Sequence, residues 1–136
     1  MNLKSENLVE IRRDFHRFPE LGFKEKRTKD KIIGYLKELG LDVHSGAGIV
    51  GVLRSGEGNK VIGLRADMDA LPIRETNTHD YVSNNTGVMH ACGHDGHMTM
   101  LLGAAHKLSK NANFSGTIVF IFQPNEELGL GAKAMM

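Results

Sequence analysis

The spacing of apolar residues predicts three amphipathic helices. Residues 6–18 place apolar side chains three and four positions apart, and Pro19 ends this run. Residues 24–39 carry a second apolar stripe, and Gly40 is the residue type that commonly ends a helix. A third helix is predicted over 95–108. Its apolar positions are Met98, Leu101, Leu102 and Ala105.

Four shorter runs are predicted as strands: 41–44, 49–53, 61–66 and 116–122. The connection between the second and third runs contains two glycines and an asparagine, which is typical of a β-hairpin with a long loop. The third run, VIGLRA, is apolar over most of its length, as expected for a central buried strand. Residues 71–88 are predicted to form a long loop, and a further helix is expected near the end of the chain.

The alternation of apolar strands and amphipathic helices predicts an α/β sandwich. In such folds, ligands bind beyond the carboxyl ends of strands. Asp67 and Asp69 follow one predicted strand, and Glu126 and Glu127 follow another. This placement favours a functional role for both acidic pairs.

Composition narrows the class of protein. The 136 residues, 40% of them hydrophobic, suffice for about one domain with a buried core. Seventeen basic and sixteen acidic residues leave a net charge of +1, and no basic stripe indicates a nucleic-acid or membrane-surface partner. There is no apolar run long enough to span a bilayer and no signal-peptide pattern at the start, so a cytoplasmic location is expected.

The segment MHACGHDGH, residues 89–97, concentrates groups that bind transition metals. Cys92 and His94 are predicted to hold one metal ion or two adjacent ions from a loop, because thiolate and imidazole are good zinc ligands. A lone cysteine or histidine is usually a packed core residue, but several on one glycine-rich loop favour a metal site. Asp95 is predicted as the N-cap of the following helix, where a carboxylate is favoured.

The remaining histidines are weaker candidates. His90 and His97 are expected to support the metal site or to be structural. Four more histidines are isolated in the sequence, and an ordinary structural role is favoured for them: His16, His44, His79 and His106.

The acidic pairs supply further chemistry. Glu126 and Glu127 are adjacent and point in different directions, so one can bind a metal while the other transfers a proton. Most such pairs are surface residues, but this pair follows an apolar strand. Asp67 or Asp69 can orient a metal-bound histidine. For Asp69, the role of a turn acid that accepts backbone N–H groups is equally favoured.

Other enzyme classes lack their signatures. The chain has no GxSxG elbow and no P-loop. A cysteine hydrolase that uses Cys92 and a nearby histidine is an alternative, although residues so close in sequence rarely form such a pair.

Four segments together resemble a known family: HRFPELGFKE (16–25), LRADMDALPI (64–73), MHACGHDGH (89–97) and GTIVFIFQPNEELGLGAKAMM (116–136). They are similar to the N-terminal part of the bacterial and plant amidohydrolases that include hippurate hydrolase, N-acyl-amino-acid amidohydrolases and auxin-conjugate hydrolases. These belong to the wider aminoacylase and carboxypeptidase clan of metallopeptidases. The resemblance covers nearly the whole chain, in order.

The resemblance implies a three-layer α/β/α catalytic domain with two divalent metal ions, of manganese, zinc, nickel or cobalt. It implies that Cys92, His94 and Glu127 are metal ligands. It also implies that Glu126 is the general base, which takes a proton from the attacking water and passes it to the leaving amine. The implied substrate is a small N-acyl amino acid. Nucleic acid and membrane are not expected as partners, and a homo-oligomer is a further possibility.

Two positions depart from the family pattern. Arg65 stands where the wider clan has a ligating histidine, so Arg65 is not carried over as a ligand, and Asp67 keeps only a role in supporting the ligands, like Asp95. Asn125 stands where alanine is usual in this branch, which is a small change beside Glu126.

Length is the larger departure, because family members continue with further histidine ligands, a lid and dimerisation domain, and the rest of the catalytic domain. Residues 1–136 are therefore expected to form a partial catalytic domain with little or no activity alone. The alternative is a non-catalytic domain that retains the fold and binds a metal or a partner.

Overall fold

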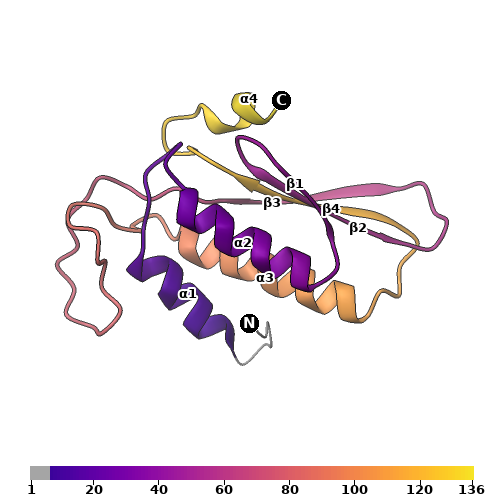
Figure 1. Cartoon of the computed structure of the whole chain (residues 1–136), viewed down its shortest axis with the longest axis horizontal. Helices are drawn as coiled ribbons and strands as arrows, with labels where there is room; N and C mark the ends of the chain where they lie inside the picture. The colour runs from indigo at the N-terminus through magenta and orange to yellow at the C-terminus, as the bar shows by residue number, and fades with distance from the viewer. Residues whose placement is uncertain (1–6) are drawn as a thin grey trace.

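The computed structural model describes residues 7–136. The helices are α1 (Leu8–Arg17), α2 (Lys26–Glu38), α3 (His94–Lys110) and α4 (Gly131–Met135). The strands are β1 (Asp42–Ser45), β2 (Ile49–Ser55), β3 (Val61–Asp67) and β4 (Gly116–Gln123). Three helices cover one face of a four-stranded mixed sheet, and the short α4 lies over the other face (Figure 1). The predicted α/β class and its three-layer order are confirmed.

The end of α2 is formed as the sequence predicts. Gly40 follows the helix with a φ of 79°, a conformation that glycine adopts at little cost. The N–H of Gly40 donates to the carbonyl of Lys37. The N–H of Leu41 donates to the carbonyl of Leu36, and the two bonds form a Schellman motif. At the other end of the chain, Glu6, the predicted first residue of α1, lies outside the described residues.

The predicted hairpin between β2 and β3 is wrong, because these strands are not neighbours in the sheet. The strand order is β1-β2-β4-β3, so β4 lies between the two strands that the short connection joins. The connection closes around the start of β4. The N–H of Gly58 donates to Ser115 Oγ at 2.8 Å, and the N–H of Thr117 donates to the carbonyl of Lys60 at 2.9 Å. Turn residues predict that the chain reverses its direction. They do not exclude that a strand from later in the sequence pairs between the two strands that the turn connects.

The strand β3 lies at an edge of the sheet, and its prediction as a central strand is wrong. Val61 and Ile62, at its start, are 64% and 60% exposed. Ala66 and Asp67, at its end, are buried. An apolar run shows neither how many neighbouring strands a strand has nor that both of its faces are covered.

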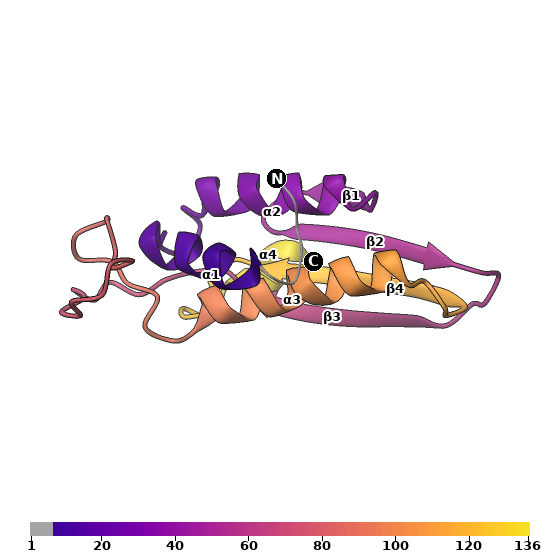
Figure 2. The ribbon, with the colours of Figure 1, turned by 90° about the horizontal axis from the view of Figure 1, so that it is seen from below.

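The core lies between the sheet and the layer formed by α1, α2 and α3 (Figure 2). Phe120 and Phe122 of β4 and Ile49 of β2 are fully buried in it. They belong to one cluster with Leu36 of α2 and Leu102 of α3. Each of these side chains contributes about 1.5–3 kcal/mol by burial, so this packing fixes α3 relative to the strands.

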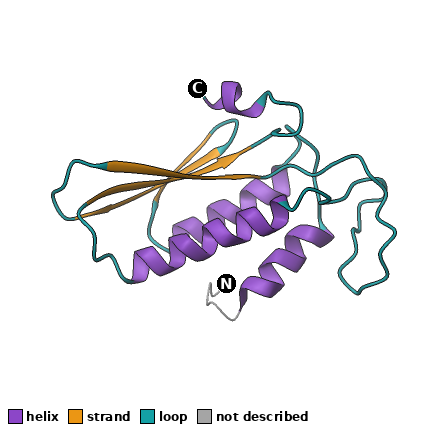
Figure 3. Ribbon diagram, turned by 180° about the vertical axis from the view of Figure 1, so that it is seen from behind, coloured by secondary structure: helices purple, strands orange, loops and turns teal. Residues whose placement is uncertain are grey.

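The predicted long loop is confirmed and extends over residues 68–93. It contains no helix or strand and is tied down by isolated bridges that pair Leu21 with Ala70 and Leu71 with Met89. Figure 3 shows it beyond the helices, at the end of the molecule where β3 and β4 end. Within residues 7–136, no helix is both long and apolar enough to cross a membrane.

Candidate metal centre

The two acidic pairs meet where the parallel strands β3 and β4 end. Strands β3 and β4 run parallel, and Asp67 is opposite Gln123 in their register. Because parallel strands end at the same edge, the chain segments after them start side by side. The fold therefore brings Asp67 and Asp69 close to Glu126 and Glu127, as the strand-end positions suggested.

His94 lies at the centre of these acids and is only 2% exposed. Its Nδ1 lies 2.7 Å from the carbonyl oxygen of Asp69 and donates to it in the tautomer that this contact selects. Its Nε2 faces carboxylate oxygens of Asp67, Glu126 and Glu127 at 3.5, 3.6 and 3.5 Å. A histidine held by a backbone carbonyl through one nitrogen, with the other nitrogen turned toward acids, is typical of a metal ligand.

Two overlapping sets of ligand atoms share His94. One consists of Cys92, His94 and Glu127, and the other of Asp67, His94 and His97. Within each set the ligand atoms all lie within 4.8 Å of one another. Glu127 Oε1 is buried and has no hydrogen-bond partner among the described residues, which fits an oxygen that binds a metal ion. We call the residues of both sets, with Glu126, the His94 centre.

The electrostatics of the His94 centre favour a cation. Burial disfavours protonated His94, but the hydrogen bond with Asp69 and the charge of Asp67 outweigh burial and raise the pKa of His94 to about 9. The hydrogen bond with Glu127, together with burial, raises the pKa of the Cys92 thiol. A divalent cation reverses both effects, since it replaces the imidazole proton and stabilises the thiolate. The donor set thus fits a transition-metal ion.

Backbone contacts hold the acids in place. Asp69 Oδ2 accepts a hydrogen bond from the N–H of Glu127 at 3.0 Å, which is the turn-acid role left open by the sequence. Burial opposes ionisation of Asp69, but hydrogen bonds from His94 and from backbone N–H groups lower its pKa. Asp67 Oδ1 accepts from His97 Nδ1 at 2.7 Å. His97 therefore belongs to the centre more directly than its position in the sequence indicated.

The prediction that Asp95 is the N-cap of α3 is wrong. Gly93 is the N-cap, two residues before the predicted one, and has a φ of 85°. Asp95 lies in the first turn and is buried. Its Oδ2 lies 2.9 Å from Arg12 Nε and 2.8 Å from His16 Nδ1, so its carboxylate joins α3 to α1.

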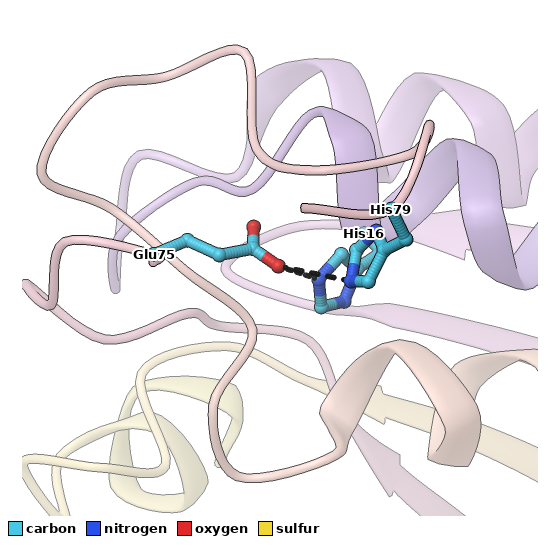
Figure 4. Close-up of side chains that lie close together, drawn as sticks. All are labelled: His16, Glu75 and His79. Carbon is cyan, nitrogen blue, oxygen red and sulfur yellow. Dashed lines mark hydrogen bonds and ion pairs between the residues drawn. The ribbon is translucent and has the colours of Figure 1, made fainter. Parts of the chain in front are cut away.

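A second cluster consists of His16, Glu75 and His79 and was missed by sequence reasoning (Figure 4). Glu75 Oε1 lies 2.8 Å from His16 Nε2 and 3.4 Å from His79 Nε2. His16 and His79 are isolated in the sequence but meet in the fold, because the long loop folds back over α1. No spacing signal connects residues 59 positions apart. We call His16, Glu75 and His79 the His16 cluster.

Among the described residues, His90 belongs neither to the His94 centre nor to the His16 cluster. It is 4% exposed, and neither ring nitrogen has a hydrogen-bond partner in the part of the chain that is described. Burial lowers its pKa to about 4, so the ring is neutral near pH 7. His44 lies at the surface and pairs with Asp42.

A family model matches residues 63–136 of the chain, the model of "Peptidase family M20/M25/M40". The matched stretch includes Cys92, His94, Glu126 and Glu127. The crystal structure of the Bacillus subtilis YXEP protein, a dinuclear metal binding peptidase from the M20 family, is similar to this chain with a TM-score of 0.91 and 39% identity. The similarity covers 96% of this chain and 38% of that one.

Two relatives illustrate the range of named activities. Hippurate hydrolase of Campylobacter jejuni is 50% identical over 129 residues, which is 93% of this chain and 33% of that protein. Thermostable carboxypeptidase 2 of Saccharolobus solfataricus is 47% identical over 136 residues, which is 95% of this chain and 35% of that protein. The chain thus spans about a third of the length of the curated relatives it matches.

Proposed function

The chain belongs to the peptidase family M20/M25/M40, and we propose that it forms part of an amidohydrolase catalytic domain and carries half of a two-metal site. The observation that carries this proposal is His94 Nε2, which faces three carboxylates at 3.5–3.6 Å beside Cys92. Because the chain spans about a third of its relatives, the reaction of the whole protein is part of the proposal.

The proposed ligands of the two divalent ions are Cys92, His94 and Glu127. A mixed set of thiolate, imidazole and carboxylate is compatible with zinc, cobalt, nickel or manganese. Two ions need more ligands than these three side chains, so other protein groups or waters must complete the coordination. When bound, the ions supply Lewis-acid chemistry that acidifies water and polarises the amide carbonyl.

Glu126 is the proposed general base. Its Oε2 lies 3.6 Å from His94 Nε2, and its side chain is 37% exposed, so it borders both the ligands and the solvent. Its carboxylate takes a proton from the attacking water as the new C–O bond forms. It then passes that proton to the nitrogen that leaves as the C–N bond breaks. The products are a carboxylic acid and a free amine.

Asp67 and Asp95 are proposed to support these ligands. Asp67 accepts a hydrogen bond from His97 and pairs with Arg65 at 3.2 Å, so its orientation is fixed from two sides. Asp95 anchors the first turn of α3, which begins with His94, to α1. Groups that orient ligands in this way typically change metal affinity by about 10- to 100-fold.

The proposed substrate is a small N-acyl amino acid. Hippurate belongs to this chemical class, and a carboxypeptidase also releases an amino acid from an amide bond, so both names fit one reaction. The acyl group is not specified by the residues present. A cytoplasmic location, a homo-oligomeric state and the lack of nucleic-acid or membrane partners stay predictions, as does little or no activity of residues 1–136 alone.

Cobalt binding tests the metal part of the proposal. We expect the purified chain to bind Co²⁺ with the charge-transfer absorption of a thiolate ligand, and Cys92→Ser to lose that absorption. The control His44→Ala changes a surface histidine and should leave it intact. Unchanged absorption in Cys92→Ser, or no Co²⁺ binding by the wild type, would contradict the proposal.

A chimera tests the catalytic part. This chain replaces the matching third of the Campylobacter jejuni hippurate hydrolase, and hippurate hydrolysis is measured. Glu126→Gln in the chimera should lower kcat by about 100-fold or more, because it removes the general base. A folded, metal-loaded chimera without activity would instead favour the alternative, a non-catalytic metal-binding domain.

A further inference from the structure

Two buried carboxylates from distant segments accept the backbone N–H groups on both sides of Glu126. Glu25 Oε1 accepts from the N–H of Asn125 at 2.9 Å, across 100 residues of sequence. Asp69 Oδ2 accepts from the N–H of Glu127 at 3.0 Å. The peptide groups that carry the two glutamates are therefore held by side chains and not by a helix or strand.

Glu25 is free to make this contact because Glu20 caps α2 in its place. Glu25 occupies the N-cap position, yet its side chain makes no capping hydrogen bond. The Glu20 carboxylate accepts from the N–H groups of Arg27 and Thr28, at 3.1 and 2.7 Å. These are the second and third helical residues, the positions that an N-cap side chain normally serves. Glu20 thus caps α2, while Glu25 bonds to the N–H of Asn125.

Burial makes the Glu25 contact costly. The residue is 2% exposed, and burial raises the pKa of its carboxyl group. A buried carboxyl group costs free energy unless neighbouring groups bond to it. Since α2 is already capped by Glu20, the helix gives no reason for a second carboxyl group at this place. The partner that Glu25 reaches is the turn after β4.

That turn has a conformation that most residues avoid. Asn125 has a φ of 43°, in the left-handed region, where asparagine is one of the best-tolerated side chains. Gly22 packs against it so closely that a Cβ at position 22 would lie 2.0 Å from Asn125 Oδ1. The segment 20–25 therefore fits the turn both in shape and in hydrogen bonding.

We propose that Glu25 is a positioning residue for the His94 centre: its carboxyl group holds the Asn125 turn so that Glu126 and Glu127 face His94. The roles of those two glutamates rest on the function proposed above. Glu25 bonds to the backbone N–H of Asn125 and belongs to no group of possible metal ligands among the described residues, so it acts through the backbone and not on substrate or metal. Without it, Glu127 is less well placed as a ligand, and metal affinity falls.

The test compares the two glutamates of one loop by titrating the 136-residue chain with Co²⁺. Glu25→Leu should weaken Co²⁺ binding by about 10- to 100-fold, the usual effect of losing a group that orients a ligand. Glu20→Leu should lower the melting temperature and leave the affinity unchanged, because it removes only the helix cap. Glu25→Gln keeps an oxygen acceptor for the Asn125 N–H and should restore the affinity.

A second readout needs no metal. Amide hydrogen exchange at residues 125 and 127 should become faster in Glu25→Leu and stay unchanged in Glu20→Leu. If the wild type bound no Co²⁺, the function proposed above would fail, while this comparison would still decide the role of Glu25. Equal exchange in the two variants, or equal loss of Co²⁺ affinity, would overturn the proposal. If Glu25→Leu does not fold, Glu25→Asp and Glu20→Asp make the same comparison with the charge retained.

Discussion

Two histidines of this chain are buried among carboxylates, and they differ in how far the carboxylate oxygens lie from the ring nitrogens. Around His94, three carboxylate oxygens stay 3.5–3.6 Å from Nε2. Around His16, each ring nitrogen lies 2.8 Å from a carboxylate oxygen, of Asp95 on one side and Glu75 on the other. The shorter distance is that of a direct hydrogen bond, and the longer one is not.

This difference indicates which of the two groups suits a metal ion. Each ring nitrogen of His16 already lies at hydrogen-bond distance from a carboxylate oxygen, so direct hydrogen bonds hold the ring on both sides. In the His94 centre, Glu127 Oε1 is buried without a hydrogen-bond partner and lies 3.5 Å from His94 Nε2, a separation at which one metal ion can bind both atoms. We therefore expect a metal ion at His94 and none in the His16 cluster, although three possible ligand atoms lie within 4.8 Å of one another there too.

Removing His94 should have the largest effect. His94→Ala deletes the ligand that both sets share and should weaken Co²⁺ binding by more than about 100-fold, beyond the effect of losing an orienting group. Isothermal titration measures the change, with His44→Ala as the control. If His94→Ala bound Co²⁺ as tightly as the wild type, the contrast between the two histidines would be lost.

Removing His16 should affect stability and spare metal binding. His16→Leu leaves the buried carboxylates of Asp95 and Glu75 without the ring between them. A buried polar group that loses its hydrogen-bond partner costs about 1–3 kcal/mol, and more if it is charged, so urea unfolding should show a loss of at least this size. The number of bound Co²⁺ ions should not change. A variant that bound one ion fewer would reveal a metal site in the His16 cluster, where we infer hydrogen bonds alone.

Acid should weaken the His16 cluster through Glu75. Burial opposes ionisation of Glu75, but hydrogen bonds from His16, from the N–H of Ser83 and from Asn77 lower its pKa from 4.5 to about 2. A lowered pKa means that ionised Glu75 stabilises the fold above pH 4.5, and that this contribution is lost as the pH falls from 4.5 toward 2. The contribution is on the order of 3 kcal/mol.

The variant Glu75→Gln isolates this effect. Its unfolding free energy should be below that of the wild type at neutral pH, and the two values should converge toward pH 2, where the wild-type side chain is also becoming neutral. Urea titrations at a series of pH values measure the difference. A difference that does not depend on pH would mean that the charge of Glu75 is not what stabilises the loop.

Removing His79 should have the smallest effect. Its Nε2 lies 3.4 Å from Glu75 Oε1, and its ring stacks on Tyr81 with centroids 3.8 Å apart. His79→Ala should cost about 0.5–1.5 kcal/mol, the range for an aromatic pair. Added Zn²⁺ should shift the melting temperature of this variant and of the wild type equally. A Zn²⁺ shift that disappears with His79 would show that the cluster binds metal.

Much of the fold could be predicted because its signals are local. Gly40 ends α2 through its own backbone conformation, and the run after Gly116 is apolar enough to be a strand in any context. The position of β4 between β2 and β3 could not be predicted, because strand pairing depends on contacts between residues that are far apart in the sequence. The same reason explains why β3 was wrongly expected to be central.

The candidate site shows the same difference between local signals and contacts over a long sequence distance. Cys92, on the loop before α3, and His94, the first residue of α3, lie two residues apart, and their chemistry can be predicted from the sequence. The contact between Glu25 and Asn125 spans 100 residues, and that between His16 and Glu75 spans 59. Nothing in the residues near Glu25 shows that Glu20 takes over the helix cap. Such roles become visible only when the chain is folded.

A crystal grown with Zn²⁺ and measured for anomalous scattering tests the central claim most directly. We predict an anomalous peak in contact with Cys92 Sγ, His94 Nε2 and the Glu127 carboxylate, and no peak between His16, Glu75 and His79. A peak in the His16 cluster, or the absence of any peak at His94, would contradict the assignment of a metal to one buried histidine and of direct hydrogen bonds alone to the other.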